Sequence, residues 1–259
     1  MKTLIMKFGG AAVATPQHFS RIADIILHRK KHYQRIVVVV SAMGETTNQL
    51  IALANEVNAS PPRREYDMLV SVGERISISL LAMALAAKNQ HAVSFTGSQS
   101  GIITCQNHSN ARIIEVKPHR LIPILDSGSV VIVAGFQGVS RQGEITTLGR
   151  GGSDTSAVAL GIALKAEKVE FFKDVLGICM DDPKIVPESP LLPHLSYDEA
   201  LKIIRQGAKV LQARSVELAS KNKILLHVLS FQNDLQTTQS GTLIGNIDVA
   251  REEIPIYEE

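Results

Sequence analysis

Short runs of apolar residues alternate with longer amphipathic segments along this chain, and this alternation constrains its fold more than any other feature. The run Ile36–Val40 is continuously β-branched, which is typical of a strand buried on both faces. Amphipathic segments such as Gln17–His32 carry apolar residues at helical spacing. Strands that alternate with helices form a mainly parallel sheet covered on both sides, so the sequence predicts an α/β fold.

The same pattern assigns the other elements of the chain. The segment Asn58–Arg64 contains two adjacent prolines and is expected to be a loop. Ligands of such sheets bind beyond the carboxyl ends of the strands, where several glycine-rich segments of this chain fall. Further strands are expected at Leu4–Phe8, Ala92–Thr96, Val130–Ala134, Lys168–Lys173 and Leu225–Leu229, and helices at Thr47–Val57, Asp67–Asn89, Ser153–Lys165, Tyr197–Gln206 and Gln212–Asn222.

Composition excludes several classes of function. The formal net charge is +2, from 27 basic and 25 acidic residues, so no strong field favours nucleic acid or a membrane surface. No apolar run approaches a membrane-spanning length, and the N-terminus lacks a signal-peptide pattern, which favours the cytoplasm. Cys105 and Cys179 have neither disulfide-framework nor zinc-site spacing, so no protein metal site is expected.

Residues 149–157 read GRGGSDTSA and run into an apolar, alanine-rich segment. Glycines let a backbone approach a ligand closely, and the first turn of the following helix offers free N–H groups to an anion. Arg150 supplies a planar fork for a carboxylate or a phosphate. A capped glycine-rich turn is the plain alternative, but an arginine, an acid and three hydroxyls at one turn favour a site for anionic substrates.

Other loops carry similar equipment. Lys7-Phe8-Gly9-Gly10 ends the first expected strand, where a lysine and two glycines can hold a phosphate. A small, hydroxylated segment, 41–48, follows the β-branched run, and two lysine-containing segments lie at 173–184 and 207–211. Taken alone, Lys7 could be a solvated residue at a strand edge, and the segment 41–48 could be a turn capped by a threonine. The Walker A and protein-kinase signatures are absent.

Taken in order, these segments resemble the catalytic domain of aspartokinases, in the amino-acid-kinase superfamily. The motifs are KFGG, SAMGETTN, SVGER, GFQG, GRGGSDTSA, KDVLGI, DPKIV, SYDEA and GAKVL, which span roughly residues 2–246. The resemblance implies an open αβα sandwich with a mainly parallel central sheet. It also implies one catalytic domain, 1–246, with an amino-acid lobe at about 1–145, a nucleotide lobe at about 146–246, and an acidic tail at 247–259 without ACT domains.

The function implied by the resemblance is ATP-dependent phosphorylation of the β-carboxylate of L-aspartate, as in lysine biosynthesis. Such a transfer requires charge neutralisation and alignment of two anions rather than a strong base. The resemblance places Lys7 at the transferring phosphoryl group, Lys209 at the nucleotide phosphates, and Asp154 between the lysines. Mg²⁺ would be held mainly by phosphate and water.

The resemblance also implies how each substrate is held. Arg150 would bind the α-carboxylate of aspartate and Glu74 its α-ammonium group. Glu74 lies in an otherwise apolar segment, where an unpaired acid would be costly, although a solvated charge near a helix start is the alternative. The remaining residues implied in aspartate binding are Ser41 and Thr47, and those implied in nucleotide binding are Gly9, Gly10, Ser153, Lys173, Asp174, Lys184 and Lys209.

Five positions in three segments depart from the pattern typical of aspartokinases. Ala11 and Ala12 replace two hydroxylated residues after KFGG, Lys173 replaces a threonine, and Gln212-Ala213 replaces His-Pro. Two alternatives therefore stay open: a homologue that phosphorylates another small acceptor, and a non-catalytic nucleotide-binding partner subunit. The resemblance suggests a homodimer that packs through helices of the amino-acid lobe.

Overall fold

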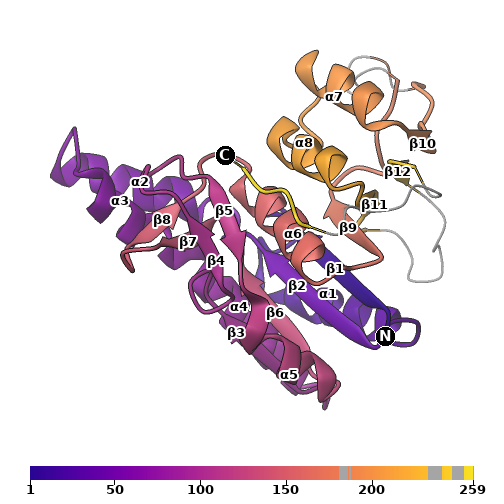
Figure 1. The fold of residues 1–259 in the computed structure, drawn as a ribbon, viewed down its shortest axis with the longest axis horizontal. Helices are drawn as coiled ribbons and strands as arrows, with labels where there is room; N and C mark the ends of the chain where they lie inside the picture. The colour runs from indigo at the N-terminus through magenta and orange to yellow at the C-terminus, as the bar shows by residue number, and fades with distance from the viewer. Residues whose placement is uncertain (181–185, 187, 233–240, 247–253, 259) are drawn as a thin grey trace.

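The central layer of the molecule is an eight-stranded sheet (Figure 1). The structure is a computed structural model, and it describes residues 1–180, 186, 188–232, 241–246 and 254–258. All neighbouring strands of this sheet are parallel except β11 and β12. In spatial order they are β10 (His194–Leu195), β12 (Thr242–Ile244), β11 (Leu225–Ser230), β9 (Lys168–Lys173), β1 (Thr3–Phe8), β2 (Arg35–Val40), β6 (Val130–Ala134) and β3 (Ala92–Phe95).

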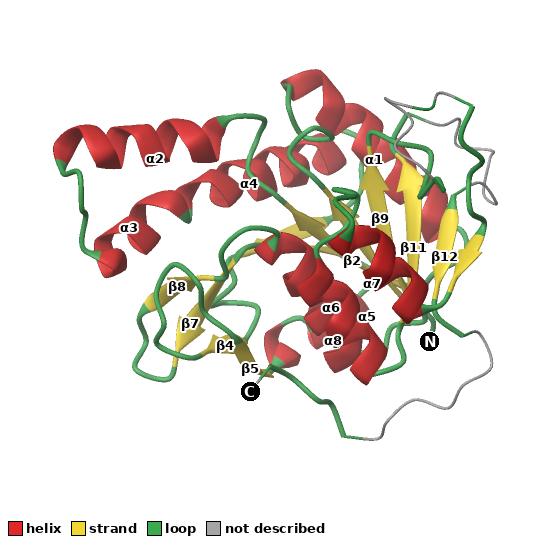
Figure 2. Cartoon of the chain, turned by 90° about the horizontal axis from the view of Figure 1, so that it is seen from above, coloured by secondary structure: helices red, strands yellow, loops and turns green. Residues whose placement is uncertain are grey.

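Helices cover both faces of this sheet, as Figure 2 shows from above. Helices α1 (Pro16–Lys30) and α4 (Val72–Ala86) pack on one face. The other face is covered by α5 (Ile122–Asp126), α6 (Gly152–Ala163), α7 (Tyr197–Arg205) and α8 (Ala213–Lys221), and a short 3₁₀ helix, Pro118–Arg120, precedes α5.

Alternation along the strands explains this double cover. In β2, Val37 and Val39 face the α6 side, whereas Ile36, Val38 and Val40 face the α1 side. Every one of these side chains is buried, because successive residues of a strand point to opposite faces and both faces carry helices. The open αβα sandwich expected from the sequence is confirmed.

One long helix expected from the sequence is two helices in the structure. Helix α3 (Arg63–Val70) ends and α4 begins at Ser71, and α2 (Thr46–Val57) precedes them. The segment Arg63–Ala86, 24 residues long, is apolar enough to cross a membrane by length and composition, so the expectation of no such run is wrong. Leu81 and Leu85 of this segment are nevertheless fully buried against α1 and the sheet, as in the core helix of a globular domain.

A second, smaller sheet lies beside the first and was not expected from the sequence. Its strands have only three or four residues each, which leaves little periodicity to recognise. Their spatial order is β5 (Ile113–Val116), β4 (Ile102–Thr104), β7 (Gln137–Ser140) and β8 (Ile145–Thr147). Strand β8 leads into the GRGGSDTSA segment, so this sheet supports the site from one side.

The described part of the C-terminal segment, residues 254–258, packs on the domain. The backbone N–H of Glu258 donates to the carbonyl of Ile113 in β5, and the Glu258 carboxylate accepts from the N–H of the same residue. The side chain of Asn222 exchanges hydrogen bonds with the backbone of Ile256. These residues dock beside β5, where Figure 1 marks the C-terminus.

Candidate functional site

Two lysines converge on one buried acid at the carboxyl ends of the central strands. The Nζ of Lys7, in β1, lies 2.6 Å from Oδ1 of Asp154, and the Nζ of Lys173, at the end of β9, lies 3.1 Å from Oδ2. Lys7 faces α6 because it lies two residues after Ile5, which packs on that side. Asp154 lies in the first turn of α6, where the helix dipole stabilises a negative charge.

Burial and neighbouring charges compete at this cluster. Burial lowers the pKa of Lys7 to about 8, and the positive charge of Lys173 adds to this effect while Asp154 opposes it. Burial alone would raise the pKa of Asp154, but the two lysines more than offset it and hold that pKa below its usual value. The cluster thus holds two cationic groups around one carboxylate, an arrangement that can neutralise phosphate oxygens.

Two loops close around this cluster. The N–H of Gly44 donates to the carbonyl of Gly10 at 3.2 Å, which joins the loop after β1 to the loop after β2. The Oγ of Ser41 lies 2.8 Å from the Oγ of Ser153, which joins the end of β2 to the first turn of α6. Gly9 follows Lys7 by two residues and its carbonyl accepts the N–H of Ala12 at 3.0 Å. The loop that contains Gly9 and Gly10 therefore contacts the loop after Ser41, and Ser41 in turn contacts Ser153.

Glu74 is a buried acid with one unpartnered oxygen. Its Oε1 accepts the backbone N–H of Ala42 at 3.1 Å, whereas Oε2 is buried without a hydrogen-bond partner in the described structure. Burial raises the pKa of Glu74 to about 7, against the opposing effects of backbone N–H groups and Lys7. A buried carboxylate oxygen without a donor is costly, so this group is suited to receive a cation from a bound molecule.

Arg150 lies at the tip of a tight glycine turn before α6. Gly149 and Gly151 have φ values of 77° and 73°, in the left-handed region that favours glycine. A Cβ on Gly151 would lie 1.7 Å from the Cγ of Gln212, so the turn also packs tightly. The Arg150 side chain is exposed and has no ion-pair partner among the described residues, which leaves its guanidinium available to an anion.

Other residues implied in the site form no hydrogen bond or ion pair with the cluster in the part of the chain that the structure describes. Thr47 is half-buried in the first turn of α2, and Asp174 is exposed after β9; neither forms a side-chain hydrogen bond with a described residue. Lys209 is exposed between α7 and α8, with no ion-pair partner among the residues that the structure describes. Lys184 lies outside the described residues.

The positions that depart from the aspartokinase pattern lie beside the site. Ala11 is exposed, and Ala12 is buried in the turn after Gly10. Lys173 adds a cation at Asp154. Gln212 packs against Gly151 and directly precedes the first residue of α8, without a capping hydrogen bond from its side chain.

Sequence reasoning missed two buried or half-buried ions that hold the Arg150 turn. Asp67 of α3 is fully buried and binds Thr147, and Arg214 of α8 binds the carbonyl of Leu148. The sequence offers one signal for Asp67, an acid among apolar residues at the start of a helical segment, the same signal that pointed to Glu74. Nothing in the sequence distinguishes Arg214 from a surface cation.

Comparison with known proteins identifies the family of this chain. A model of the amino acid kinase family matches residues 2–230, so the chain belongs to the amino acid kinase family. The chain is 47% identical over 260 residues to an aspartokinase of Mycolicibacterium smegmatis, and the match covers 100% of this chain and 60% of that protein. The resemblance to aspartokinases seen in the sequence is confirmed.

Solved structures show the same likeness. Aspartate kinase from Synechocystis matches with a TM-score of 0.85 and 42% identity, over 96% of this chain and 40% of the other. E. coli aspartokinase III, in complex with aspartate and ADP, matches with a TM-score of 0.84 and 28% identity, over 95% of this chain and 65% of the other. UMP kinase from Bacillus anthracis, at 21% identity and a TM-score of 0.68, shares the fold. The chain spans about 60% of the length of the curated relatives that it matches.

Proposed function

We propose that this chain catalyses the transfer of the γ-phosphoryl group of ATP to the β-carboxylate of L-aspartate. The observation that carries the proposal is the buried, unpartnered carboxylate oxygen of Glu74, a group whose pKa is raised by burial and lowered in part by the charge of Lys7. The exposed guanidinium of Arg150, which has no ion-pair partner among the described residues, adds a second group for an amino acid. The guanidinium of Arg150 can bind an α-carboxylate, and the carboxylate of Glu74 can bind an α-ammonium group. The ammonium groups of Lys7 and Lys173 can neutralise the two anions that react, the β-carboxylate and the γ-phosphate. E. coli aspartokinase III is in complex with aspartate and ADP, which are the acceptor and the nucleotide product of the proposed reaction.

In the proposed mechanism the protein aligns and neutralises two anions. The aspartate β-carboxylate is already a nucleophile at neutral pH, so no side chain has to remove a proton. Lys7 would neutralise the charge of the transferring phosphoryl group, and Asp154 would hold the ammonium groups of Lys7 and Lys173 in place. Gly9, Gly10 and Ser153 would donate to phosphate oxygens at the start of α6.

Nucleotide binding would fall on the lobe that follows the Arg150 turn. We propose a single catalytic domain in which residues 1–145 bind the amino acid and residues 146–246 bind the nucleotide, with Lys173, Asp174, Lys184 and Lys209 on the nucleotide side. Asp154 is already paired with two lysines, so it is not free to serve as a metal ligand. Mg²⁺ would accordingly be held by phosphate oxygens and water, and would neutralise charge between the phosphates.

We also propose a homodimer in the cytoplasm. Apolar side chains are exposed on α2, α3 and α4, a larger set than single scattered residues would give. These are Leu53, Val57, Met68, Val72, Ile76 and Met83. The two cysteines are free in the structure, as is usual in a reducing compartment. Light scattering on the protein with Val57→Lys, compared with the unaltered protein, would show loss of the dimer if this surface forms it.

The direct test is an assay of ADP release with the acyl phosphate trapped by hydroxylamine. L-Aspartate should give ADP and the hydroxamate in equal amounts, and both should require Mg·ATP. A panel of glutamate, carbamate and UMP tests other acceptors. Turnover with another acceptor alone, or ATP binding without any turnover, would contradict the proposal and favour one of the two alternatives.

A further inference from the structure

A buried carboxylate holds the strand that carries the Arg150 turn. Asp67, in α3, is fully buried. Its Oδ2 accepts the backbone N–H of Thr147 at 3.0 Å, and its Oδ1 accepts the hydroxyl of the same residue at 2.6 Å. Thr147 ends β8 and stands three residues before Arg150. The Asp67 carboxylate of α3 thereby fixes the end of β8, the strand that leads into the Arg150 turn.

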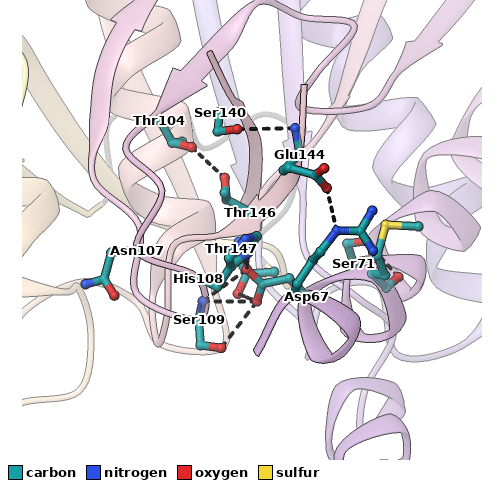
Figure 3. A network of polar contacts seen from close by, with 12 residues as sticks. Asp67, Ser71, Thr104, Asn107, His108, Ser109, Ser140, Glu144, Thr146 and Thr147 are labelled. Carbon is teal, nitrogen blue, oxygen red and sulfur yellow. Dashed lines mark hydrogen bonds and ion pairs between the residues drawn. The ribbon is translucent and has the colours of Figure 1, made fainter. Parts of the chain in front are cut away.

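The same carboxylate fixes a second segment beside the turn. The N–H of Ser109 lies 3.1 Å from Oδ1 and 3.0 Å from Oδ2 of Asp67, its hydroxyl lies 3.4 Å from Oδ1, and the Nδ1 of His108 lies 2.9 Å from Oδ2. Figure 3 shows these donors gathered around Asp67 from the loop and from β8. Both oxygens of the Asp67 carboxylate accept hydrogen bonds, as expected for a buried acid that stabilises its surroundings.

The second segment is in direct contact with the turn. A Cβ placed on Gly149 would lie 3.2 Å from the carbonyl oxygen of Ser109 and 3.1 Å from Oδ1 of Asn110. This segment therefore packs closely against Gly149, the residue before Arg150. Burial raises the pKa of the Tyr66 hydroxyl, and the carboxylate of Asp67 adds to this effect whereas the positive charge of Arg150 opposes it.

Arg214 holds the opposite side of the same strand. Its Nη1 donates to the carbonyl of Leu148 at 2.7 Å, and its Nη2 donates to the carbonyl of Ala111 at 2.6 Å. The two segments that Asp67 joins are thus joined again by a cation from α8. Between these two ions the turn has little freedom to move, so the position of Arg150 depends on both.

From this arrangement we propose that Asp67 is a positioning residue, which sets the place of the Arg150 guanidinium through Thr147 and Ser109. This inference rests on the proposed function, in which Arg150 binds the α-carboxylate of the amino acid. Asp67 does not touch the substrate in this account. An asparagine at this position offers an N–H₂ group to backbone donors that need an acceptor, so the turn would be loosened while the shape of the side chain is kept.

The deciding experiment is a double-mutant cycle between Asp67→Asn and Arg150→Ala. In the otherwise unaltered chain, Asp67→Asn should raise the KM for aspartate by about tenfold, with kcat changed by less than about threefold, since the guanidinium contributes to substrate binding. In the Arg150→Ala chain the same substitution should leave the KM for aspartate unchanged, because the group it positions is gone. Asp198→Asn, on the exposed start of α7, is the matched control and should change neither constant.

A second readout does not depend on activity. Trypsin cleaves after arginine, so loosening of the turn should speed cleavage of the Arg150–Gly151 bond in Asp67→Asn, as judged by mass spectrometry of the two fragments. If the unaltered chain shows no turnover with aspartate, the proposed function fails, and this measurement alone decides the role of Asp67. Thr147→Val, which removes one hydrogen bond at the same carboxylate, should change both readouts in the same direction if Asp67→Asn does not fold.

Two results would overturn the inference. One is an unchanged KM for aspartate together with unchanged cleavage after Arg150 in Asp67→Asn. The other is full additivity of the two substitutions in the cycle, since a general loss of structure would weaken both backgrounds equally.

Discussion

The Nζ of Lys7 lies 2.6 Å from Oδ1 of Asp154, and both side chains are buried. This ion pair joins the first strand of the chain to a helix that begins about 145 residues later. Desolvated charges interact strongly, so their replacement should affect chemistry more than substrate affinity.

Loss of the positive charge of Lys7 should lower the activity in mildly alkaline solution. Burial brings the pKa of Lys7 to about 8, so in the free protein its ammonium group loses a proton above that pH. We expect kcat/KM for ATP to decrease as pH rises through about 8, and Lys7→Arg, which keeps its charge, to abolish this decrease. Lys7→Met should lower kcat by about 10²-fold or more at pH 7. A flat profile for the unaltered protein up to pH 9 would contradict this role.

Protonation of Glu74 should lower the activity on the acidic side. Its pKa of about 7 means that the carboxyl gains a proton as pH falls below 7, and a neutral acid is a weaker partner for an ammonium group. We expect kcat/KM for aspartate to decrease below about pH 7. Glu74→Gln should have a lower value throughout and no dependence in this range. If the variant retains the acidic decrease, another group is responsible.

Arg150 should contribute to aspartate binding alone. A hydrogen bond to a charged group contributes about 1.5–3 kcal/mol, which corresponds to a rise in KM of roughly 10- to 150-fold. We expect Arg150→Ala to show this rise for aspartate with an unchanged KM for ATP, in steady-state assays. Arg205→Ala, at an exposed ion pair on α7, is the control. Normal aspartate affinity in Arg150→Ala would refute the assignment.

The turn at Gly151 should tolerate no side chain. Gly128 has a similar φ of 77° but open space around it, whereas a Cβ on Gly151 would overlap Gln212. Gly128→Ala should therefore lose only the left-handed backbone preference, about 1–2 kcal/mol of unfolding free energy. Gly151→Ala should lose more, and Gln212→Ala should restore part of the difference. Equal losses for both glycines in urea unfolding would show that the contact with Gln212 contributes nothing.

Glu170 should stabilise the fold without contributing to the site. Its carboxylate pairs with Arg29 of α1 and Lys168 of β9, each at 2.8 Å. Burial alone would raise the pKa of Glu170, but Lys168 and Arg29 hold it below the usual 4.5. Because the folded pKa is depressed, this stabilisation is present above pH 4.5 and is lost as pH falls through the folded value.

Replacement of Glu170 tests this account. Glu170→Ala leaves Arg29 buried and unpaired, and should cost about 3–5 kcal/mol in urea unfolding at pH 7. The cost should shrink on acidification. Glu217→Ala, which breaks an exposed pair with Arg205, should have little effect. If Glu170→Ala and Glu217→Ala lose similar amounts of unfolding free energy, burial does not make the Glu170 ion pairs more stabilising than an exposed pair.

Much of the fold is visible in the sequence because the central strands have a simple pattern. A run such as Ile36–Val40 has to be buried on both faces, and glycine pairs such as Gly9-Gly10 mark where strands end. The small sheet of β4, β5, β7 and β8 was missed because three- and four-residue strands carry too little periodicity. The break at Ser71 was missed because residues on both sides of it favour helix.

The sequence alone determined which chemical groups this protein has and at which strand ends they stand: a lysine with two glycines, a hydroxylated loop, and the GRGGSDTSA turn. Only the tertiary structure decided which of them meet. It brought Lys7 and Lys173 to one carboxylate, left Lys209 exposed, and showed that Asp67 and Arg214 hold the strand before Arg150. The physical reason is that an ion pair or a hydrogen bond depends on distances of about 3 Å between distant segments, and no local pattern specifies those distances.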